Sequence, residues 1–252
     1  MKTKHMNISE KAIEYVQKNK KKLIEEFCPK NIYKSFPYPT SIFMAGSPGA
    51  GKTEFSKKFI DHLVEAMNRS INNKESVSEK FTMIRIDPDE FREKLPGYNG
   101  SNSDLFQGAV TRAVEKILDY TLHNKINFLL DGTFAKENVV LGNIKRCIDK
   151  SRTIQIIYKY QDPILAWKLT KAREYEEGRK IPLTVFIDDL FQAKDNVNKI
   201  KKLYKNKINV TLLEVSYENP SNNRLELNID NIDNYLKIKY NKDELKKILE
   251  EV

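Results

Sequence analysis

Eight consecutive residues of the sequence have the types and spacing of a phosphate-binding loop, or P-loop. The pattern G-x-x-x-x-G-K-S/T is fitted by Gly46, Ser47, Pro48, Gly49, Ala50, Gly51, Lys52 and Thr53. Glycines let the backbone wrap closely around an anion with its N–H groups turned inward. Lys52 can place a positive charge on the β- and γ-phosphates of a nucleotide, and the Thr53 hydroxyl can bind Mg²⁺. We therefore assign these residues to the binding of ATP or GTP with Mg²⁺.

Carboxylates follow two other apolar runs of the chain. Asp87 and Asp89 come after residues 81–86, and Asp131 comes after residues 126–130. Because parallel sheets bind ligands at the carboxyl ends of their strands, these side chains should lie at the same edge as the P-loop. There they can organise Mg²⁺ and accept the proton of a substrate hydroxyl. Either Asp87 or Asp89 alone could instead be a helix cap, so the prediction depends on the three carboxylates together.

Pro88 separates the expected roles of Asp87 and Asp89. It biases Asp87 toward an extended conformation, which keeps this residue near the sheet edge and the P-loop. Asp89 lies one step further out, at the start of a helix whose dipole favours the ionised carboxylate. We therefore predict that Asp89 is the catalytic base and that Asp87, with Thr53, lies at the metal.

A third segment, residues 171–182, carries two arginines on either side of a glycine. Arg173 precedes Gly178 and Arg179 follows it. P-loop kinases commonly place cations on a mobile segment over the phosphates, where they neutralise the charge that develops during transfer. The alternative for this segment is an ordinary charged helix exposed to solvent.

The elements that position these residues alternate between strand and helix. Short apolar runs predict strands at 41–45, 81–86, 126–130, 154–160 and 210–215, and a further strand near 225–229. Helical spacing of apolar residues predicts helices at 9–27, after the P-loop, at 104–123, 137–150, after Pro163, at 184–204 and at 242–251. Ser9 can cap the first helix, and the polar residues 69–80 predict a loop.

Such alternation requires a mainly parallel sheet with helices on both faces. We therefore predict an α/β fold, a P-loop kinase-like three-layer fold with a mainly parallel central sheet. The length of 252 residues suits a single domain. We expect this domain to span 1–252, with an N-terminal helix at 9–27 and a short C-terminal appendage at 220–252.

The net charge does not by itself identify a partner. It is +9, but the lysines are spread along the whole chain, which favours an ordinary solvated surface over a nucleic-acid footprint. Aromatic residues lie among lysines at Tyr33, Phe36 and Tyr38, near Lys30 and Lys34. Those aromatics could instead pack the N-terminal helix onto the sheet. We therefore do not expect a nucleic-acid partner.

Cysteines and apolar runs indicate the compartment. Cys28 and Cys147 are far apart and in no CxxC pattern, so we expect neither a disulfide framework nor a zinc site. No apolar run approaches the ~20 residues of a membrane span. The N-terminus lacks the apolar core of a signal peptide. We therefore expect a cytoplasmic protein without a membrane partner.

Four segments together resemble the zeta toxin family of P-loop kinases. They are GSPGAGKT at 46–53, IDPDEFREKLPGY at 86–98, LLDGT at 129–133 and AREYEEGRKIP at 172–182. The resemblance extends over roughly residues 10–215. The P-loop occurs in many families, whereas the DxDxFR segment followed by Leu-Pro and Tyr is more specific. By this resemblance Asp89 corresponds to the catalytic base, Lys52 to the nucleotide-binding lysine, and Arg173 and Arg179 to arginines that bind phosphates.

The resemblance also implies a substrate class. Asp131 stands where some members carry a substrate-contacting Glu, and this shorter carboxylate departs from their pattern. We place Asp131, Thr133 and Arg92 at the substrate. Family members phosphorylate UDP-N-acetylglucosamine on the sugar 3′-hydroxyl, and the toxic members are silenced by an antitoxin. The implied partners are thus a nucleotide sugar and an antitoxin protein.

Two other functions fit parts of the sequence. One is a kinase for another small metabolite or for a nucleic-acid end. The other is a non-catalytic nucleotide-binding switch, which would keep the P-loop but would need no hydroxyl base. Asp89 and the arginine segment argue against the switch.

Overall fold

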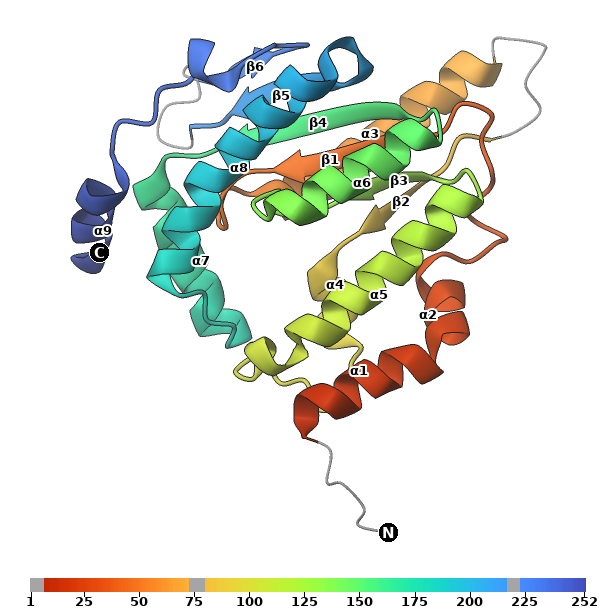
Figure 1. Cartoon of the computed structure of the whole chain (residues 1–252), viewed down its shortest axis with the longest axis horizontal. Helices are drawn as coiled ribbons and strands as arrows, with labels where there is room; N and C mark the ends of the chain where they lie inside the picture. The colour runs from red at the N-terminus through yellow and green to blue at the C-terminus, as the bar shows by residue number, and fades with distance from the viewer. Residues whose placement is uncertain (1–6, 73–79, 217–222) are drawn as a thin grey trace.

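The computed structural model describes residues 7–72, 80–216 and 223–252. Within these ranges a six-stranded sheet has the strand order β2-β3-β1-β4-β5-β6 (Figure 1). Its strands are β1 (Thr40–Ala45), β2 (Met83–Ile86), β3 (Asn127–Leu130), β4 (Thr153–Tyr160), β5 (Asn209–Glu214) and β6 (Arg224–Glu226). Neighbouring strands are parallel except for β5 and β6. The predicted α/β fold with a mainly parallel sheet is confirmed.

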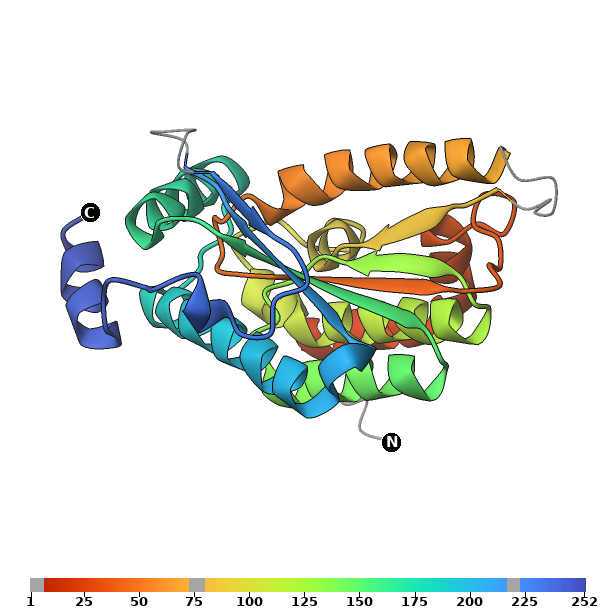
Figure 2. The same cartoon turned by 90° about the horizontal axis from the view of Figure 1, so that it is seen from above.

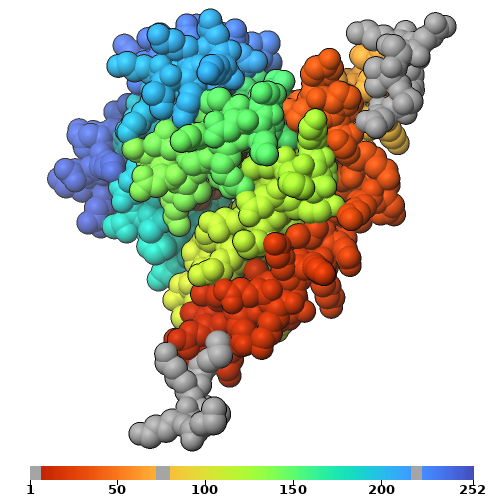
Figure 3. Space-filling model, turned by 45° about the vertical axis from the view of Figure 1, so that its right-hand side comes forward, coloured from red at the N-terminus to blue at the C-terminus, as the bar shows by residue number. Residues whose placement is uncertain are grey.

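Helices cover both faces of this sheet. Their bounds are α1 (Ile8–Lys18), α2 (Lys20–Phe27), α3 (Lys52–Asn72), α4 (Pro88–Glu93), α5 (Ser103–His123), α6 (Glu137–Asp149), α7 (Pro163–Glu177), α8 (Leu183–Tyr204) and α9 (Lys242–Glu250). Figure 2 shows α3 on one face and α5, α6 and α8 on the other. In Figure 3 the red helices α1 and α2 lie against the yellow-green α5, which they contact directly.

Side chains of the central strand β1 alternate between two apolar cores. Ile42 and Met44 join the core under α3, whereas Phe43 and Ala45 join the larger core on the opposite face. This is the pattern of a parallel strand buried on both faces, which explains why the run is continuously apolar. Burial on both sides fixes the end of β1, and the P-loop begins there.

The predicted helix at 9–27 is interrupted in the structure. Asn19 leaves helical geometry, and its side-chain amide donates to the Tyr15 carbonyl oxygen over 2.9 Å. Asn7, rather than Ser9, caps the first helix by accepting from the Glu10 amide. Asparagine competes for backbone hydrogen bonds in this way and therefore ends helices as well as starting them. The loop expected at 69–80 begins later than predicted, since α3 continues to Asn72, and residues 73–79 lie outside the described ranges.

The C-terminal residues pack against the rest of the fold. Ile229, Ile232, Leu245 and Leu249 are buried in the larger core, and α9 packs against α7 and α8. Near the N-terminus Phe36 packs edge-to-face on Phe81. No helix in the described part of the chain is long and apolar enough to cross a membrane.

Candidate active site

The P-loop lies at the position where the chain order of the sheet reverses. β1 has β3 on one side and β4 on the other, and the carboxyl ends of strands at such a position are where α/β sheets usually bind ligands. Gly46 has φ +134°, and a Cβ there would overlap the Lys159 carbonyl oxygen. Gly49 has φ +70°, and a Cβ there would overlap the Ala166 carbonyl oxygen of α7. The loop therefore needs glycine at both positions, for backbone conformation and for close packing on β4 and α7.

Lys52 is hydrogen-bonded to the backbone of the P-loop. Its Nζ donates to the carbonyl oxygens of Gly46 and Ser47, over 3.0 and 2.6 Å. Burial lowers the pKa of Lys52 to about 8, although the nearby carboxylates of Asp131 and Asp189 act in the opposite direction. An anion in the loop would supply the negative charge that this ammonium group lacks.

A second lysine is hydrogen-bonded to the P-loop backbone. Lys159 at the end of β4 is buried, and its Nζ donates to the Ala50 carbonyl oxygen of the P-loop. Burial lowers the pKa of this lysine as well. Lys159 was not among the predicted site residues. The available signal was a charged residue inside the apolar run at 154–160.

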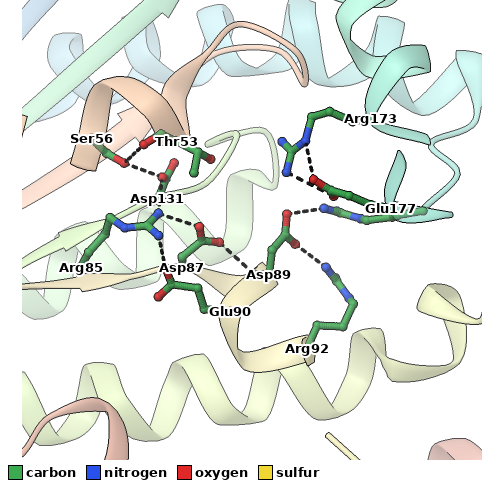
Figure 4. Close-up of polar contacts among 11 residues, drawn as sticks. Thr53, Ser56, Arg85, Asp87, Asp89, Glu90, Arg92, Asp131, Arg173 and Glu177 are labelled. Carbon is green, nitrogen blue, oxygen red and sulfur yellow. Dashed lines mark hydrogen bonds and ion pairs between the residues drawn. The ribbon is translucent and has the colours of Figure 1, made fainter. Parts of the chain in front are cut away.

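The carboxylates at the ends of β2 and β3 meet beside the P-loop helix. Ile86 pairs with Leu130, and the Asp131 amide donates to the Ile86 carbonyl oxygen, so the two strands end together. Asp131 is buried and accepts from the Ser56 hydroxyl of α3 over 2.7 Å (Figure 4). The residue assigned to substrate thus contacts the P-loop helix.

Arg85 joins these carboxylates into one buried network. Its Nη1 lies 2.6 Å from Asp87 Oδ2 and 3.0 Å from Asp131 Oδ2, and its Nη2 pairs with Glu90 (Figure 4). The Arg85, Asp87 and Asp131 side chains are each 10% exposed or less. The guanidinium group therefore supplies the counter-charge that two neighbouring buried carboxylates require. This role was not predictable from sequence, because Arg85 lies within a predicted strand.

Asp87 is both a helix cap and a candidate metal ligand. Its Oδ1 accepts from the Asp89 amide over 2.8 Å, at the N-terminus of α4. Burial, with the charges of Asp131 and Asp89, raises the pKa of Asp87 to about 6. The carboxylate of Asp87 and the hydroxyl of Thr53 are hard oxygen donors of the kind that Mg²⁺ prefers. Among the described residues no group of three or more His, Cys, Asp or Glu could hold a metal alone. An ion here would thus draw on phosphate and water oxygens, as Mg²⁺ usually does.

Asp89 is more exposed than the other two predicted site aspartates, Asp87 and Asp131. Its side chain is 31% exposed and forms ion pairs with Arg92 of α4 and with Arg179. Arg92 is buried, donates also to Gln107 over 3.0 Å, and has no partner for its Nε. Arg92, expected at the substrate, thus contacts the Asp89 carboxylate directly. The structure places Asp89 between two cations, one at each carboxylate oxygen.

The predicted arginine segment, at the end of α7, also lies near Asp89. Arg179 crosses to Asp89, while Arg173 pairs with Glu177 over 3.2 Å. The charge of Asp89 also acts on Arg173, and the charge of Arg173 acts on Lys52. Arg173 therefore lies near both the P-loop and Asp89, and Arg179 is joined to Asp89 by an ion pair.

Asp189 of α8 is a further carboxylate at this site. It is half-buried, is hydrogen-bonded to the Thr133 side chain, and interacts electrostatically with Lys52. Burial raises the pKa of Asp189, and Lys52 and Thr133 counteract this effect. The Thr133 carbonyl oxygen accepts from the Gly46 amide over 3.1 Å, so this group adjoins the P-loop. Nothing in the sequence distinguished Asp189 from other acidic residues of an amphipathic helix.

Comparisons with known structures agree with this fold. The structure is similar to one described as belonging to the PezAT chromosomal toxin-antitoxin system of the human pathogen Streptococcus pneumoniae, with a TM-score of 0.56 and 18% identity. That match covers 98% of this chain and 89% of the other. It is also similar to a structure of AvrRxo1-ORF1:-ORF2 with ATP, with a TM-score of 0.58 and 14% identity over 92% of this chain and 71% of the other. No curated protein sequence matches the chain.

The family model described as Zeta toxin matches residues 23–228, which is most of the chain. All four segments that resemble this family fall within or across the matched range. Together with the P-loop and its carboxylates, the match supports a nucleotide-dependent kinase. The chain belongs to the Zeta toxin family.

Proposed function

We propose that the chain transfers the γ-phosphate of ATP or GTP to a hydroxyl group of a small anionic metabolite. One observation supports this proposal most strongly: Asp89 has a partly exposed carboxylate between Arg92 and Arg179, in a chain with a complete P-loop. A nucleotide-binding switch has no use for such a base. A kinase needs one within reach of the acceptor hydroxyl.

The reaction follows from the positions of these groups. The nucleotide phosphates occupy the P-loop, where Lys52 exchanges its backbone carbonyl partners for phosphate oxygens. Thr53 and Asp87 would hold Mg²⁺, which would supply positive charge to those oxygens. The acceptor oxygen forms a bond to the γ-phosphorus as the bond to the β,γ-bridging oxygen breaks, and Asp89 takes the hydroxyl proton.

Cations beside the γ-phosphate complete the proposed site. Arg173 and Arg179 stabilise the charge on the group in transfer. Asp131 and Thr133 are assigned to the acceptor side, as the family resemblance implies. In the structure Asp131 is buried against Ser56, so its effect on the acceptor would operate through the position of the P-loop helix.

The acceptor that we propose is UDP-N-acetylglucosamine or a related nucleotide sugar. Its phosphates are anionic, which suits a site that carries Arg173 and Arg179, and its sugar provides hydroxyl groups. Family membership supports the assignment. The similarity to a structure from a toxin-antitoxin system supports an antitoxin protein as a partner. A different metabolite, or a nucleic-acid end, is the alternative acceptor.

Mass spectrometry can identify the acceptor directly. The protein would be incubated with ATP, Mg²⁺ and, in separate reactions, UDP-N-acetylglucosamine, a small-metabolite extract and a single-stranded oligonucleotide. We expect a mass gain of one phosphate on the nucleotide sugar, and none with Lys52→Ala. A gain confined to another compound would reassign the acceptor. No gain on any compound, from folded protein that binds ATP, would contradict kinase activity.

A further inference from the structure

Two loops at the far end of α7 touch through their backbones. Gly100, in the loop before α5, has φ +85°, and a Cβ there would overlap the Glu177 carbonyl oxygen. Gly178 has φ +71°, and a Cβ there would lie 3.6 Å from the Ser101 amide nitrogen. We call this meeting of residues 99–101 with Glu177 and Gly178 the loop contact. It lies where the end of α7 approaches the start of α5 (Figure 1).

Each side of the loop contact is joined to a group of the proposed site. The loop before α5 follows α4, which carries Asp89 in its first turn. On the other side Glu177 pairs with Arg173, and Arg179 follows two residues later and pairs with Asp89. The two segments are thus connected twice, once by backbone contact and once by an ion pair between proposed catalytic groups.

The loop before α5 has a fixed shape of its own. The Asn102 side chain donates to the Gly97 carbonyl oxygen over 2.9 Å and accepts from the Asn99 amide over 3.1 Å. Ser101 donates to the Asn99 side chain over 3.0 Å. A loop that is closed by its own hydrogen bonds does not adapt easily to a neighbour. The carbonyl group of Glu177 must therefore fit the surface that the loop presents.

A glycine also packs on a backbone carbonyl oxygen at the opposite end of α7. There Gly49 of the P-loop packs on the Ala166 carbonyl oxygen, with no room for a Cβ. Eleven residues separate Ala166 from Glu177, about 16 Å along a helix. One glycine contact thus sets α7 against the nucleotide loop and the other sets it against the loop that follows Asp89. Arg173 lies between the two contacts.

We propose that Gly100 is a positioning residue for phosphoryl transfer, because its lack of a side chain sets the distance of Arg173 and Arg179 from Asp89. The inference rests on the proposed function and extends it to a residue that need not touch substrate or nucleotide. A Cβ at Gly100 would push the end of α7 away from α4. Displacements near 1 Å at reacting groups lower rates by roughly a hundredfold.

The sequence offers a matched control for this glycine. Gly97 has φ +86°, nearly the value at Gly100, but the nearest atom to a Cβ there is Phe106 Cζ at 3.9 Å. Gly97→Ala therefore carries the same backbone strain without the overlap. Gly100→Asn and Gly97→Asn form a second pair, since asparagine tolerates positive φ better than alanine and still has a Cβ.

Two measurements on these variants test the proposal. The first is steady-state transfer, for which we expect a kcat at least 10-fold lower in Gly100→Ala than in Gly97→Ala, with KM for Mg²⁺-ATP within about threefold. The second is limited trypsin digestion of the nucleotide-free protein. We expect Gly100→Ala to be cut faster than Gly97→Ala after Arg179 and Lys180, with other cuts unchanged.

The two readouts separate this inference from the proposed function. Equal kcat and equal cleavage in the two variants would overturn the role of Gly100. A wild-type protein that transfers no phosphate would overturn the proposed function, and the digestion would then show by itself whether the loop contact holds the arginine segment. If both alanine variants fail to fold, the same comparison is made with the asparagine pair.

Discussion

The buried network around Arg85 allows a quantitative prediction about stability. Arg85→Met replaces the guanidinium group by an apolar side chain and leaves Asp87 and Asp131 side by side without a counter-charge. Their side chains are 8% and 4% exposed, so water cannot solvate them well. Removal of one partner from such a buried pair costs about 3–5 kcal/mol. This is a large fraction of the 5–15 kcal/mol by which native domains are usually stable.

Urea unfolding at pH 8 would measure this loss as a change in the free energy of unfolding. The control is Arg69→Met, because Arg69 pairs with Glu65 on the exposed face of α3. An exposed pair of this type contributes about 0.3–0.5 kcal/mol. We therefore expect the Arg85 variant to lose several times more stability than the Arg69 variant. Equal losses would refute the view that Arg85 neutralises the two carboxylates.

The same variants should differ in their dependence on pH. Burial raises the pKa of Asp87 to about 6, and Arg85 counteracts this rise. Without Arg85 the pKa of Asp87 should rise further. A carboxyl group with a raised pKa binds more protons in the folded than in the unfolded state, so its destabilising effect is absent at low pH and grows as the pH rises through the folded pKa. The loss in the free energy of unfolding caused by Arg85→Met should thus be smaller at pH 5 than at pH 8. A loss that is the same at both would contradict the argument.

Three further predictions concern single side chains. Lys52→Ala should abolish transfer and weaken Mg²⁺-nucleotide binding in calorimetry, and wild-type turnover would remove the P-loop from the account. Arg173→Ala and Arg179→Ala should each lower turnover by roughly a hundredfold with the fold intact; a change in melting temperature alone would instead support the exposed-helix interpretation. Cys28 and Cys147 are buried, and burial raises the pKa of both thiols. Activity should therefore resist mild oxidation, and a folded double serine variant should keep it.

The position of the site was predictable because it follows from one rule about parallel sheets. Three aspartates were found after apolar runs, and strands that end together bring such residues together. The partners of these residues were not predictable. Arg85 and Lys159 are charged residues inside strands, and an apolar pattern gives no reason for them. The loop contact joins residues 77 positions apart, Gly100 and Glu177, so only the tertiary structure reveals it.

The prediction of one unbroken helix near the N-terminus was wrong for a local reason. Periodicity predicted one helix at 9–27, since the apolar spacing continues through Asn19. The side chain of Asn19 instead bonds to the Tyr15 carbonyl oxygen and ends the first helix. A hydrophobic pattern reports which face of a segment is buried. It does not report whether the backbone continues unbroken along that face.

The central claim is that Asp89 takes the acceptor proton, whereas Asp87 binds Mg²⁺ and caps the N-terminus of α4. It is tested most directly by parallel Mg²⁺-ATP calorimetry and phosphate-transfer assays on Asp89→Asn and Asp87→Asn, with circular dichroism to verify folding. Asp89→Asn should bind Mg²⁺-ATP with nearly wild-type affinity and should transfer no phosphate. Asp87→Asn should lose Mg²⁺-ATP affinity or stability more than it loses the acceptor step. Full transfer by Asp89→Asn would contradict the claim and would move the base to Asp87 or Asp131.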